Sequence, residues 1–433
     1  MKELTKSMFS GPLNAMQDLT NSLVSTNTGK GAMEEQISDI IQAFLQASDD
    51  IQRDIVDMGF RLLEPESWTP SGFARTAAEM TARIAEGMRY ADPSSEGLAA
   101  WRELGNKVEI FRLVKYLKSR VPIPEGRFDL YEFVEKCYDL GPFLALWAVE
   151  GLGHDYAHTF RPYTETTQGI LTDPALDKLA VKSMTMLHAG IGLGFAQELL
   201  DGTTDSTPSS EVRETLDLFI RLCKQNSRPG YEGAAIESLG IVTRNWHRNL
   251  VKIVDEQLID FDEEAAAYFW RGAGRALYFQ PVNFVPMYGS IANAIYMSKQ
   301  ESPHEMARHN TLAGIAWAAT VVNMRHPEVM EAFLNRHGDE VDGQDAFING
   351  VVSSIIMRQD TTPDEPFIRD FIEHTPDVSN SHLEDLWKDI IRKPGDEGLS
   401  KFYPVLRDCH RLGEVFRYQC LAALVENLGA ENR

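Results

Sequence analysis

Three side chains that could do chemistry follow one another at intervals of four residues: Glu150, His154 and His158. In a continuous helix this spacing places them in one stripe. Two histidines four residues apart can bind one divalent metal ion, and a carboxylate one turn earlier suits Fe, Mn or Zn. The same residues could instead act as a catalytic acid and base without a metal. They could also be structural, with the histidines donating to backbone carbonyls or lying on a solvated polar face.

A second candidate set could bind a substrate. Arg271 and Arg275 are one helical turn apart and could clamp a carboxylate or phosphate group. Glu237 has the position in another helix that Arg271 has in its own. Tyr278 belongs to an aromatic segment that we expect to form a pocket wall. The competing interpretation is that Glu150 or Glu237 pairs with one of the arginines as a buried structural ion pair.

These candidates belong to an internal repeat, in which two small residues, two positions apart, interrupt an apolar helix. Glycine inside a helix costs about 1 kcal/mol relative to alanine, so close approach of neighbouring helices is its simplest explanation. The glycines could instead make room for a flat or long apolar ligand. If the inner helices are equivalent, residues just before and three after the first small residue should face one common space, an apolar pocket with a few convergent charges. The copies are VEGLGHDYAH at 149–158, HAGIGLGFAQ at 188–197, IESLGIVTRN at 236–245, WRGAGRALYF at 270–279 and LAGIAWAATV at 312–321.

In this order the copies resemble an uncharacterised bacterial family found beside enediyne polyketide synthases, whose members carry successive EGxG, GxGxA and GxGRxLWF elements. The resemblance covers roughly 140–325, and its most specific piece is GAGRALYF at 272–279. The third copy departs from the family pattern, because Glu237 and Ser238 stand where an aspartate and a glycine are usual. The resemblance implies a helical fold and a role in secondary metabolism. It implies no particular reaction.

The elements that must position these residues are helices. Apolar residues recur three and four positions apart through most of the chain, and no alternating strand pattern competes. We therefore predict an all-α protein, an array of helical hairpin repeats with glycine-rich inner helices. Short breaks are expected at 120–128, 201–210, 360–366 and 393–398. Helices are expected at 33–63, 71–91, 99–119, 128–160, 175–200, 210–226, 231–259, 263–279, 304–324, 343–359 and 399–428.

The predicted organisation has no long linker. A flexible segment, 1–32, precedes an N-terminal helical portion, 33–127. The repeat core follows at 128–337, and a C-terminal helical portion occupies 338–433. The amphipathic stretch 33–63 could pack on its own domain or form the seam of a homodimer.

Composition excludes several classes of protein. With 42 Lys and Arg against 64 Asp and Glu, the net charge of −22 argues against nucleic acid and an anionic membrane as partners. The four cysteines form no CxxC pair, and the start of the chain lacks the apolar core of a signal peptide. No stretch of about 18 apolar residues occurs. We therefore expect a cytoplasmic protein that does not enter membranes.

Two weaker candidates lie elsewhere. His188 could reach the same pocket, but a lone histidine on an apolar helix is more often a satisfied core residue. Cys409 precedes His410, and adjacent residues of a helix point to different faces, so we do not expect a Cys–His nucleophile pair there.

The functional prediction is a cytoplasmic helical protein whose interior pocket binds or transforms an apolar small molecule, such as a polyene or a polyketide-derived biosynthetic intermediate. A divalent metal could take part through Glu150, His154 and His158. The competing class is a non-enzymatic helical repeat scaffold or binding protein. In a scaffold the polar interior residues would neutralise one another in pairs.

Overall fold

The computed structural model describes residues 129–160, 168–280, 289–376 and 380–431, together with Asn283 and parts of 99–121. All of them lie within one unit of the chain, Leu98–Arg433. The predicted flexible segment 1–32 and the predicted dimer seam 33–63 lie outside the described residues. Every regular element of the described residues is a helix, so the all-α prediction is confirmed. In this part of the chain, no helix has both the length and the apolar character that a membrane crossing needs.

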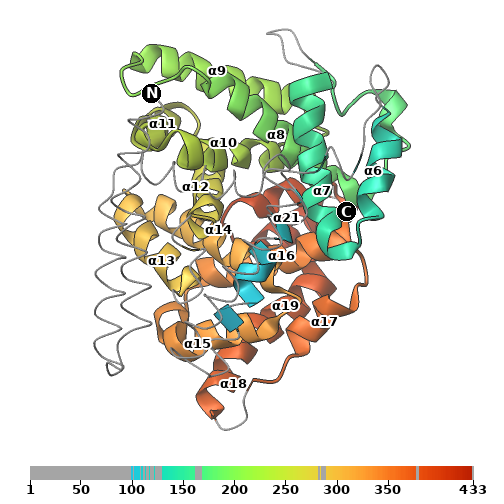
Figure 1. Cartoon of the computed structure of the whole chain (residues 1–433), viewed down its shortest axis with the longest axis vertical. Coiled ribbons are helices and arrows are strands. Elements are labelled where there is room, and N and C mark those ends of the chain that lie inside the picture. The colour runs from blue at the N-terminus through green and yellow to red at the C-terminus, as the bar shows by residue number, and fades with distance from the viewer. Residues whose placement is uncertain are drawn as a thin grey trace, which may run out of the picture. The chain divides into compact units, whose positions relative to one another are not determined.

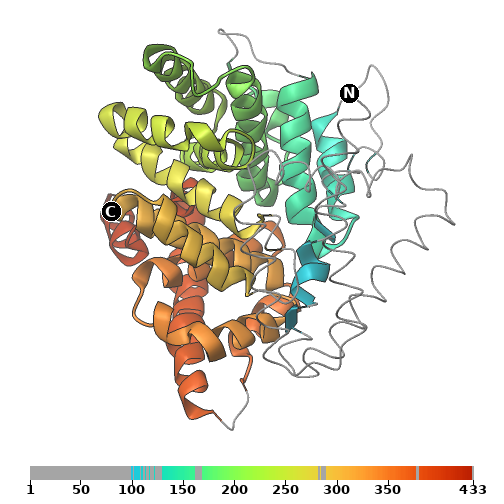
Figure 2. The same ribbon diagram turned by 60° about the vertical axis from the view of Figure 1, so that its left-hand side comes forward.

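The interior is a row of helices that includes every glycine-rich segment: α7 (Pro142–Asp155), α8 (Met184–Leu200), α10 (Glu232–Trp246), α12 (Glu263–Tyr278), α14 (Glu305–Asn323) and α16 (Asp345–Thr361). Each helix contacts the next one in this order, and α16 also contacts α7. The succession from green through yellow to orange is visible in Figures 1 and 2. The glycine-rich segments therefore occupy neighbouring helices.

Small residues bring the backbones of these helices together in one repeated register. A Cβ atom on Gly272 would lie 2.1 Å from the carbonyl oxygen of Glu237, the residue just before the first small residue of the preceding copy. Ser238 keeps the same register by donating its hydroxyl to the carbonyl of Ala189 at 2.8 Å. In the same way, a Cβ atom on Gly190 would lie 2.0 Å from the Glu150 carbonyl oxygen, and one on Gly314 would lie 2.0 Å from the Arg271 carbonyl oxygen.

A sixth copy of the repeat, which was not predicted, lies in α16 and makes a fifth contact of this kind. A Cβ atom on Gly350 would lie 2.2 Å from the carbonyl oxygen of Ala313, again the residue before the first small residue of the preceding copy. The middle small residues pack on the other neighbouring helix: a Cβ atom on Gly274 would lie 2.2 Å from the carbonyl oxygen of Thr311. Each inner helix thus has close neighbours on two sides, which is what the second small residue predicted.

The outer helices cover this row. They are α6 (Leu130–Tyr138), α9 (Ser209–Asn226), α11 (Val251–Phe261), α13 (Ser290–Glu301), α15 (Pro327–Val341) and α17 (Pro366–Glu373). In Figure 1, α9 and α11 lie at one end of the described part and α15 lies toward the other. The predicted helix 128–160 is divided at Gly141, whose φ of 93° suits glycine alone, and the predicted helix 231–259 is divided at His247. The helices α13, α15 and α17 were not predicted.

The predicted break at 393–398 is wrong. The chain stays helical from Ser381 to Asp408, because π-helical turns accommodate Pro394, which lacks an N–H donor. Gly395 and Gly398 face side chains of α16 there. The successive elements are α18 (Ser381–Trp387), η7 (Lys388–Arg392), α19 (Lys393–Glu397), η8 (Gly398–Phe402) and α20 (Tyr403–Asp408), followed by η9 (Leu412–Phe416) and α21 (Leu421–Glu431).

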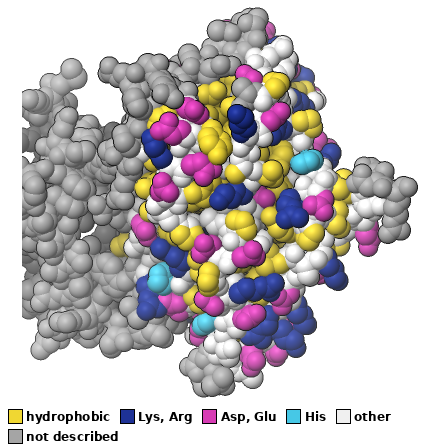
Figure 3. All heavy atoms as spheres, turned by 90° about the vertical axis from the view of Figure 1, so that its right-hand side faces the viewer, with side chains coloured by type: hydrophobic (Ala, Val, Ile, Leu, Met, Phe, Trp, Pro, Cys, Tyr) yellow, Lys and Arg dark blue, Asp and Glu magenta, His cyan; other side chains and the backbone are white. Residues whose placement is uncertain are grey.

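Short helical turns complete the described part of the chain: η2 (Tyr156–Phe160), η3 (Pro174–Leu176), η4 (Val181–Ser183) and η5 (Arg248–Leu250). On the face shown in Figure 3, acidic and basic side chains are interspersed with apolar ones over the described residues.

Candidate functional site

Four of the predicted site residues form one buried network of charges. Both carboxylate oxygens of Glu237 are used: Arg271 donates to one at 2.6 Å, and Arg275 donates to the other at 2.6 Å. Arg275 also donates to Glu150 at 3.0 Å. The Glu237 and Arg271 side chains are fully buried. Two carboxylates therefore neutralise two guanidinium groups within the interior row.

The repeat explains why these side chains meet. Glu150, Glu237 and Arg271 each stand just before the first small residue of a copy, and Arg275 stands three after it. Further residues three after the first small residue join them from α14 and α16. The Arg275 guanidinium lies 4.3 Å from the ring centre of Trp317, and Arg271 donates to the Ser353 hydroxyl at 3.1 Å. The predicted convergence of these positions is therefore found at the network.

Burial and the neighbouring charges shift the pKa values of this network in different directions. Burial lowers the pKa of Arg271 to about 10, and the Glu237 carboxylate opposes this. Burial also acts to lower the pKa of Arg275, but Glu237 and Glu150 together raise it above its ordinary value. Burial raises the pKa of Glu150, against the effect of Arg275. This arrangement agrees with the interpretation of a buried structural ion pair, because each charged group already has a charged partner.

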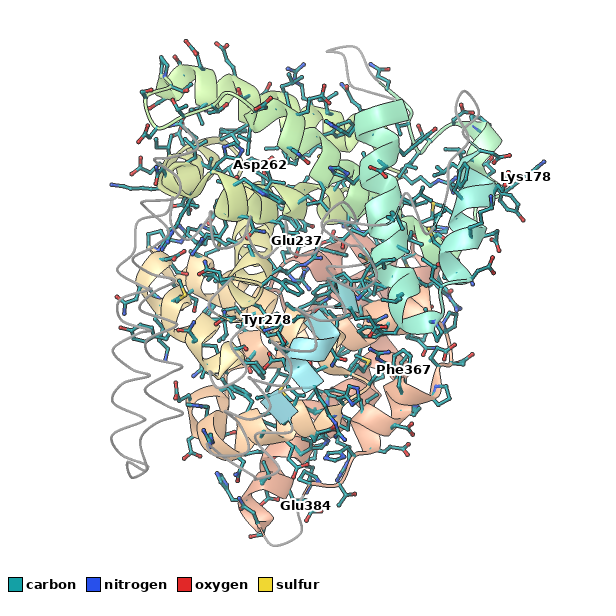
Figure 4. The ribbon with its side chains drawn as sticks, viewed as in Figure 1. Lys178, Glu237, Asp262, Tyr278, Phe367 and Glu384 are labelled. Carbon is teal, nitrogen blue, oxygen red and sulfur yellow. The ribbon has the colours of Figure 1, made fainter. Side chains whose placement is uncertain are left out.

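Tyr278 belongs to a separate buried cluster. Its hydroxyl donates to Glu103 at 2.6 Å and accepts from the Asn323 amide at 2.8 Å. The Lys107 ammonium lies 3.8 Å from the Tyr278 ring centre and 3.1 Å from the Glu103 carboxylate. Figure 4 labels Glu237 and Tyr278 at different heights in the view. Among the described residues, the Tyr278 hydroxyl bonds Glu103 and Asn323 and makes no hydrogen bond to the arginine pair.

The predicted metal ligands are not arranged as a metal site. The imidazole rings of His154 and His158 stack at 5.6 Å, and His154 Nε2 lies 2.8 Å from Oε1 of Gln197. The Glu150 carboxylate binds Arg275 instead of joining them. Among the described residues, no group of three or more His, Cys, Asp and Glu side chains could hold a metal ion. The metal prediction therefore has no support in this part of the chain.

A pocket lies away from the charged network. Its volume is about 540 Å³, and it lies where the starts of α8 and α10 meet the segment that follows α20. Two loops are held together there, because Gly413 donates its N–H to the Gly230 carbonyl at 2.8 Å. The wall is mostly apolar, and its charged residues are two arginines and Asp177. Residues that matter below are Val181, Met184, Arg228, Tyr231, Cys409 and Arg411.

Arg228 is fixed in the pocket wall by its own backbone and side chain. Its backbone N–H donates to Nε2 of His188 at 2.9 Å, and Nδ1 of that imidazole bonds the Met184 carbonyl at 2.6 Å. Burial lowers the pKa of His188 to about 4, which keeps the ring neutral. The Arg228 side chain donates to the carbonyls of Leu171 and Leu176, each at 3.0 Å. His188 is therefore a satisfied core residue that positions the pocket.

The charge of Arg228 is only weakly compensated. Its nearest carboxylate among the described residues, Asp177, lies 3.5 Å away and is 74% exposed, so water screens this pair. Arg411, the other pocket arginine, pairs with the largely buried Glu414. Arg228 is thus the better anchor for an anion.

A buried carboxyl group and a buried phenol lie next to the pocket, and the residue of the phenol, Tyr231, belongs to the pocket lining. Asp360, at the end of α16, accepts from the Thr185 hydroxyl at 3.2 Å and from the Tyr403 hydroxyl at 3.4 Å. Burial raises the pKa of Asp360 to about 7. Tyr231 stacks on His188 at 5.0 Å, and burial together with Asp360 raises the pKa of Tyr231 to about 12. Sequence analysis proposed neither residue.

The expectation that Cys409 and His410 form no nucleophile pair stays a prediction. Both residues line this pocket, although adjacent residues of a helix were expected to point to different faces. That expectation assumed a continuous helix. The helix α20 ends at Asp408, and His410 has a φ of 56°, so the chain turns between the two side chains.

The fold and the site together define an all-α protein with a glycine-packed interior row, a buried charge network and a separate pocket. The chain matches no protein-family model, no curated protein and no solved structure. The resemblance to the enediyne-associated family therefore stays a prediction.

Proposed function

We propose that this protein binds an apolar small molecule with an anionic group in the pocket beside Arg228. The observation that supports this most is a guanidinium with weak compensation in a mostly apolar wall. A volume of about 540 Å³ suits an organic ligand, and a few polar groups in an apolar pocket are typical of small-molecule sites. A planar guanidinium recognises carboxylate, sulfonate or phosphate oxygens well.

The ligand's biological source is a separate proposal. A polyene or a polyketide-derived intermediate with a carboxylate would fit this chemistry, and a cytoplasmic location would suit such a role. The protein would bind this intermediate or transform it.

The second candidate function is a non-enzymatic scaffold. It is favoured by the network of Glu150, Glu237, Arg271 and Arg275, whose charges neutralise one another. A scaffold of this kind needs no small-molecule ligand.

A dye titration separates the two functions. The probe is 8-anilinonaphthalene-1-sulfonate, which joins an apolar body to one anion, and its neutral relative N-phenyl-1-naphthylamine measures the contribution of the sulfonate. We expect saturable binding of one sulfonate dye per chain, tighter than that of the neutral dye. The unfolding midpoint of the protein must be measured with each titration to show that the protein is folded, because the dye also binds partly unfolded chains.

A pair of variants locates the binding. Val181 lines the pocket and is 50% exposed, so Val181→Trp can fill the pocket without disturbing the core. Ile259, 41% exposed on α11 and outside the pocket lining, gives the matched control Ile259→Trp. We expect Val181→Trp to weaken dye binding about tenfold or more, a loss of about 1.4 kcal/mol, and Ile259→Trp to leave it unchanged. Equal binding by both variants would refute the proposal.

A further inference from the structure

The Asp360 carboxyl group is buried beside the pocket and is held only by hydroxyl groups. Asp360 is 2% exposed, and its two oxygens accept hydrogen bonds from Thr185 at 3.2 Å and from Tyr403 at 3.4 Å. Thr185 follows Met184, a residue of the pocket lining, in the first turn of α8. The carboxyl group is therefore bonded to the direct neighbour of a lining residue.

These surroundings favour the protonated form of Asp360. Among the charged side chains of the described residues, Arg407 is the one that stabilises the carboxylate, but its side chain is 49% exposed, so water screens its charge. Glu237, in contrast, is buried against two arginines. A buried carboxylate without a paired cation is costly, and two neutral donors offset only part of the cost. Burial accordingly raises the pKa of Asp360 to about 7.

The other titratable groups next to Asp360 keep one charge state near neutral pH. They are phenols from three elements: Tyr403 in α20, Tyr138 in α6 and Tyr231 before α10. Burial is the main cause that raises the pKa of each phenol, to about 12 for Tyr231 and Tyr403, and the Asp360 carboxyl adds to it. The imidazole of His188, stacked on Tyr231, stays neutral because burial lowers its pKa to about 4. Asp360 is thus the member of this cluster that changes its charge near pH 7.

We propose that the Asp360 proton controls the pocket: an apolar anion binds well while Asp360 is protonated, and loss of the proton weakens its binding. The inference rests on the proposed function, in which Arg228 binds the anionic group. Its physical cause is repulsion between like charges inside the protein. At an effective dielectric constant of about 20, two like charges about 15 Å apart change an affinity about sixfold, and salt reduces this factor. The anion therefore enters the pocket together with part of a proton.

The test measures the affinity for 8-anilinonaphthalene-1-sulfonate from pH 5.5 to pH 8, with the unfolding midpoint recorded at each pH. In wild-type protein we expect the dissociation constant to rise about threefold or more over this range. In Asp360→Asn, whose amide is neutral at every pH, it should stay nearly constant. The neutral dye N-phenyl-1-naphthylamine should bind both proteins without pH dependence, because it is not repelled by a carboxylate.

His410 requires a control of its own. It lines the pocket and is exposed, and a protonated imidazole there would also strengthen anion binding at low pH. His410→Asn removes the imidazole, and asparagine tolerates the φ of 56° at this position. We expect this variant to keep the pH dependence of wild type. If His410→Asn abolishes the dependence and Asp360→Asn retains it, the imidazole controls the pocket and the inference is overturned.

Proton uptake gives a second measurement that does not depend on the folding of Asp360→Asn. Calorimetric titration of His410→Asn with the sulfonate dye, in two buffers with different ionisation enthalpies, counts the protons bound with each dye molecule. A three- to tenfold effect of the Asp360 charge predicts uptake of about 0.3–0.5 proton near pH 7.5. Uptake below about 0.1 proton would overturn the inference.

Failure of the inference is distinguishable from failure of the proposed function. If the sulfonate dye binds at no pH, the proposed function fails, and the inference fails with it. If the dye binds with one affinity from pH 5.5 to pH 8, or Asp360→Asn shows the same pH dependence as wild type, the inference alone fails. The anion site at Arg228 then stands without control by Asp360.

Discussion

Replacement of Gly272 by alanine tests the packing that aligns the buried charges. The new Cβ atom would lie 2.1 Å from the Glu237 carbonyl oxygen, whereas ordinary contacts begin at 3.4 Å. The α10 and α12 backbones must therefore separate by about 1.3 Å, the difference of these distances. The backbone fixes the position of the new Cβ atom, and its partner is a backbone oxygen, so neither can rotate away as a flexible side chain could.

The expected cost follows from two opposing effects. Overpacking of a core costs about 1–3 kcal/mol and occasionally more, and a clash between backbones lies at the upper end. Alanine recovers about 1 kcal/mol over glycine inside a helix. We therefore expect Gly272→Ala to lower the free energy of unfolding by about 2 kcal/mol, as measured by urea denaturation followed by far-UV circular dichroism.

Gly429 is the control, because a Cβ atom there meets nothing within 4 Å and the residue lies in α21. Gly429→Ala should leave the free energy of unfolding unchanged or raise it by less than about 1 kcal/mol. If Gly272→Ala is as stable as Gly429→Ala, the close backbone contact is absent and the packing argument is wrong.

Three further predictions concern buried ionisable groups. Glu237→Gln leaves Arg271 and Arg275 short of one buried negative charge. We therefore expect it to lower the free energy of unfolding, measured by urea denaturation, by about 3–5 kcal/mol. Adding Arg271→Met should restore part of this free energy. Asp360 has a folded-state pKa of about 7 against an ordinary 3.8, so its contribution to stability is present below 3.8 and is lost as the pH rises through 7. Asp360→Asn should therefore be more stable than wild type at pH 8, by at most about 4 kcal/mol, and equal to it near pH 4. His188 has the opposite sign: its pKa is lowered from 6.5 to about 4, so stability is lost as the pH falls through this window. The Asp360→Asn variant isolates this effect, because it lacks the opposite pH dependence of Asp360. Its unfolding midpoint should decline steadily from pH 6.5 to 4, and a flat profile would contradict the burial of a neutral His188 imidazole.

Helical periodicity and the spacing of small residues were sufficient to predict the fold class and the convergence of Glu150, Glu237, Arg271 and Arg275. Each position is fixed by its offset from a small residue, and offsets are readable from sequence. The sixth copy at Gly350 was missed because its second small position is occupied by Val352. Its spacing of 36 residues from Gly314 falls within the range of the other copies and could have revealed it.

The pocket could not be predicted in the same way. Arg228 and Tyr231 lie in a turn before α10, and Cys409 lies beyond α20, almost 180 residues later in the chain. Nothing in the spacing of these residues indicates that the two turns meet. A buried Asp360 was equally hidden, because it stands in a segment, DTTPDEP, that has the composition of a surface turn. The RPGY turn at 228–231 offered one signal, an arginine and a tyrosine fixed by a proline and a glycine.

The central claim is that an apolar anion occupies the pocket beside Arg228, and protection of Cys409 tests it most directly. Cys409 lines the pocket and is partly exposed, whereas Cys420 is exposed and outside the pocket lining. Alkylation of each thiol by iodoacetamide can be followed by peptide mass spectrometry, with and without saturating 8-anilinonaphthalene-1-sulfonate. We expect the dye to slow alkylation of Cys409 about tenfold, which corresponds to about 1.4 kcal/mol in activation free energy. The alkylation rate of Cys420 should stay unchanged. An unchanged Cys409 rate in the presence of bound dye would place the ligand elsewhere and contradict the claim.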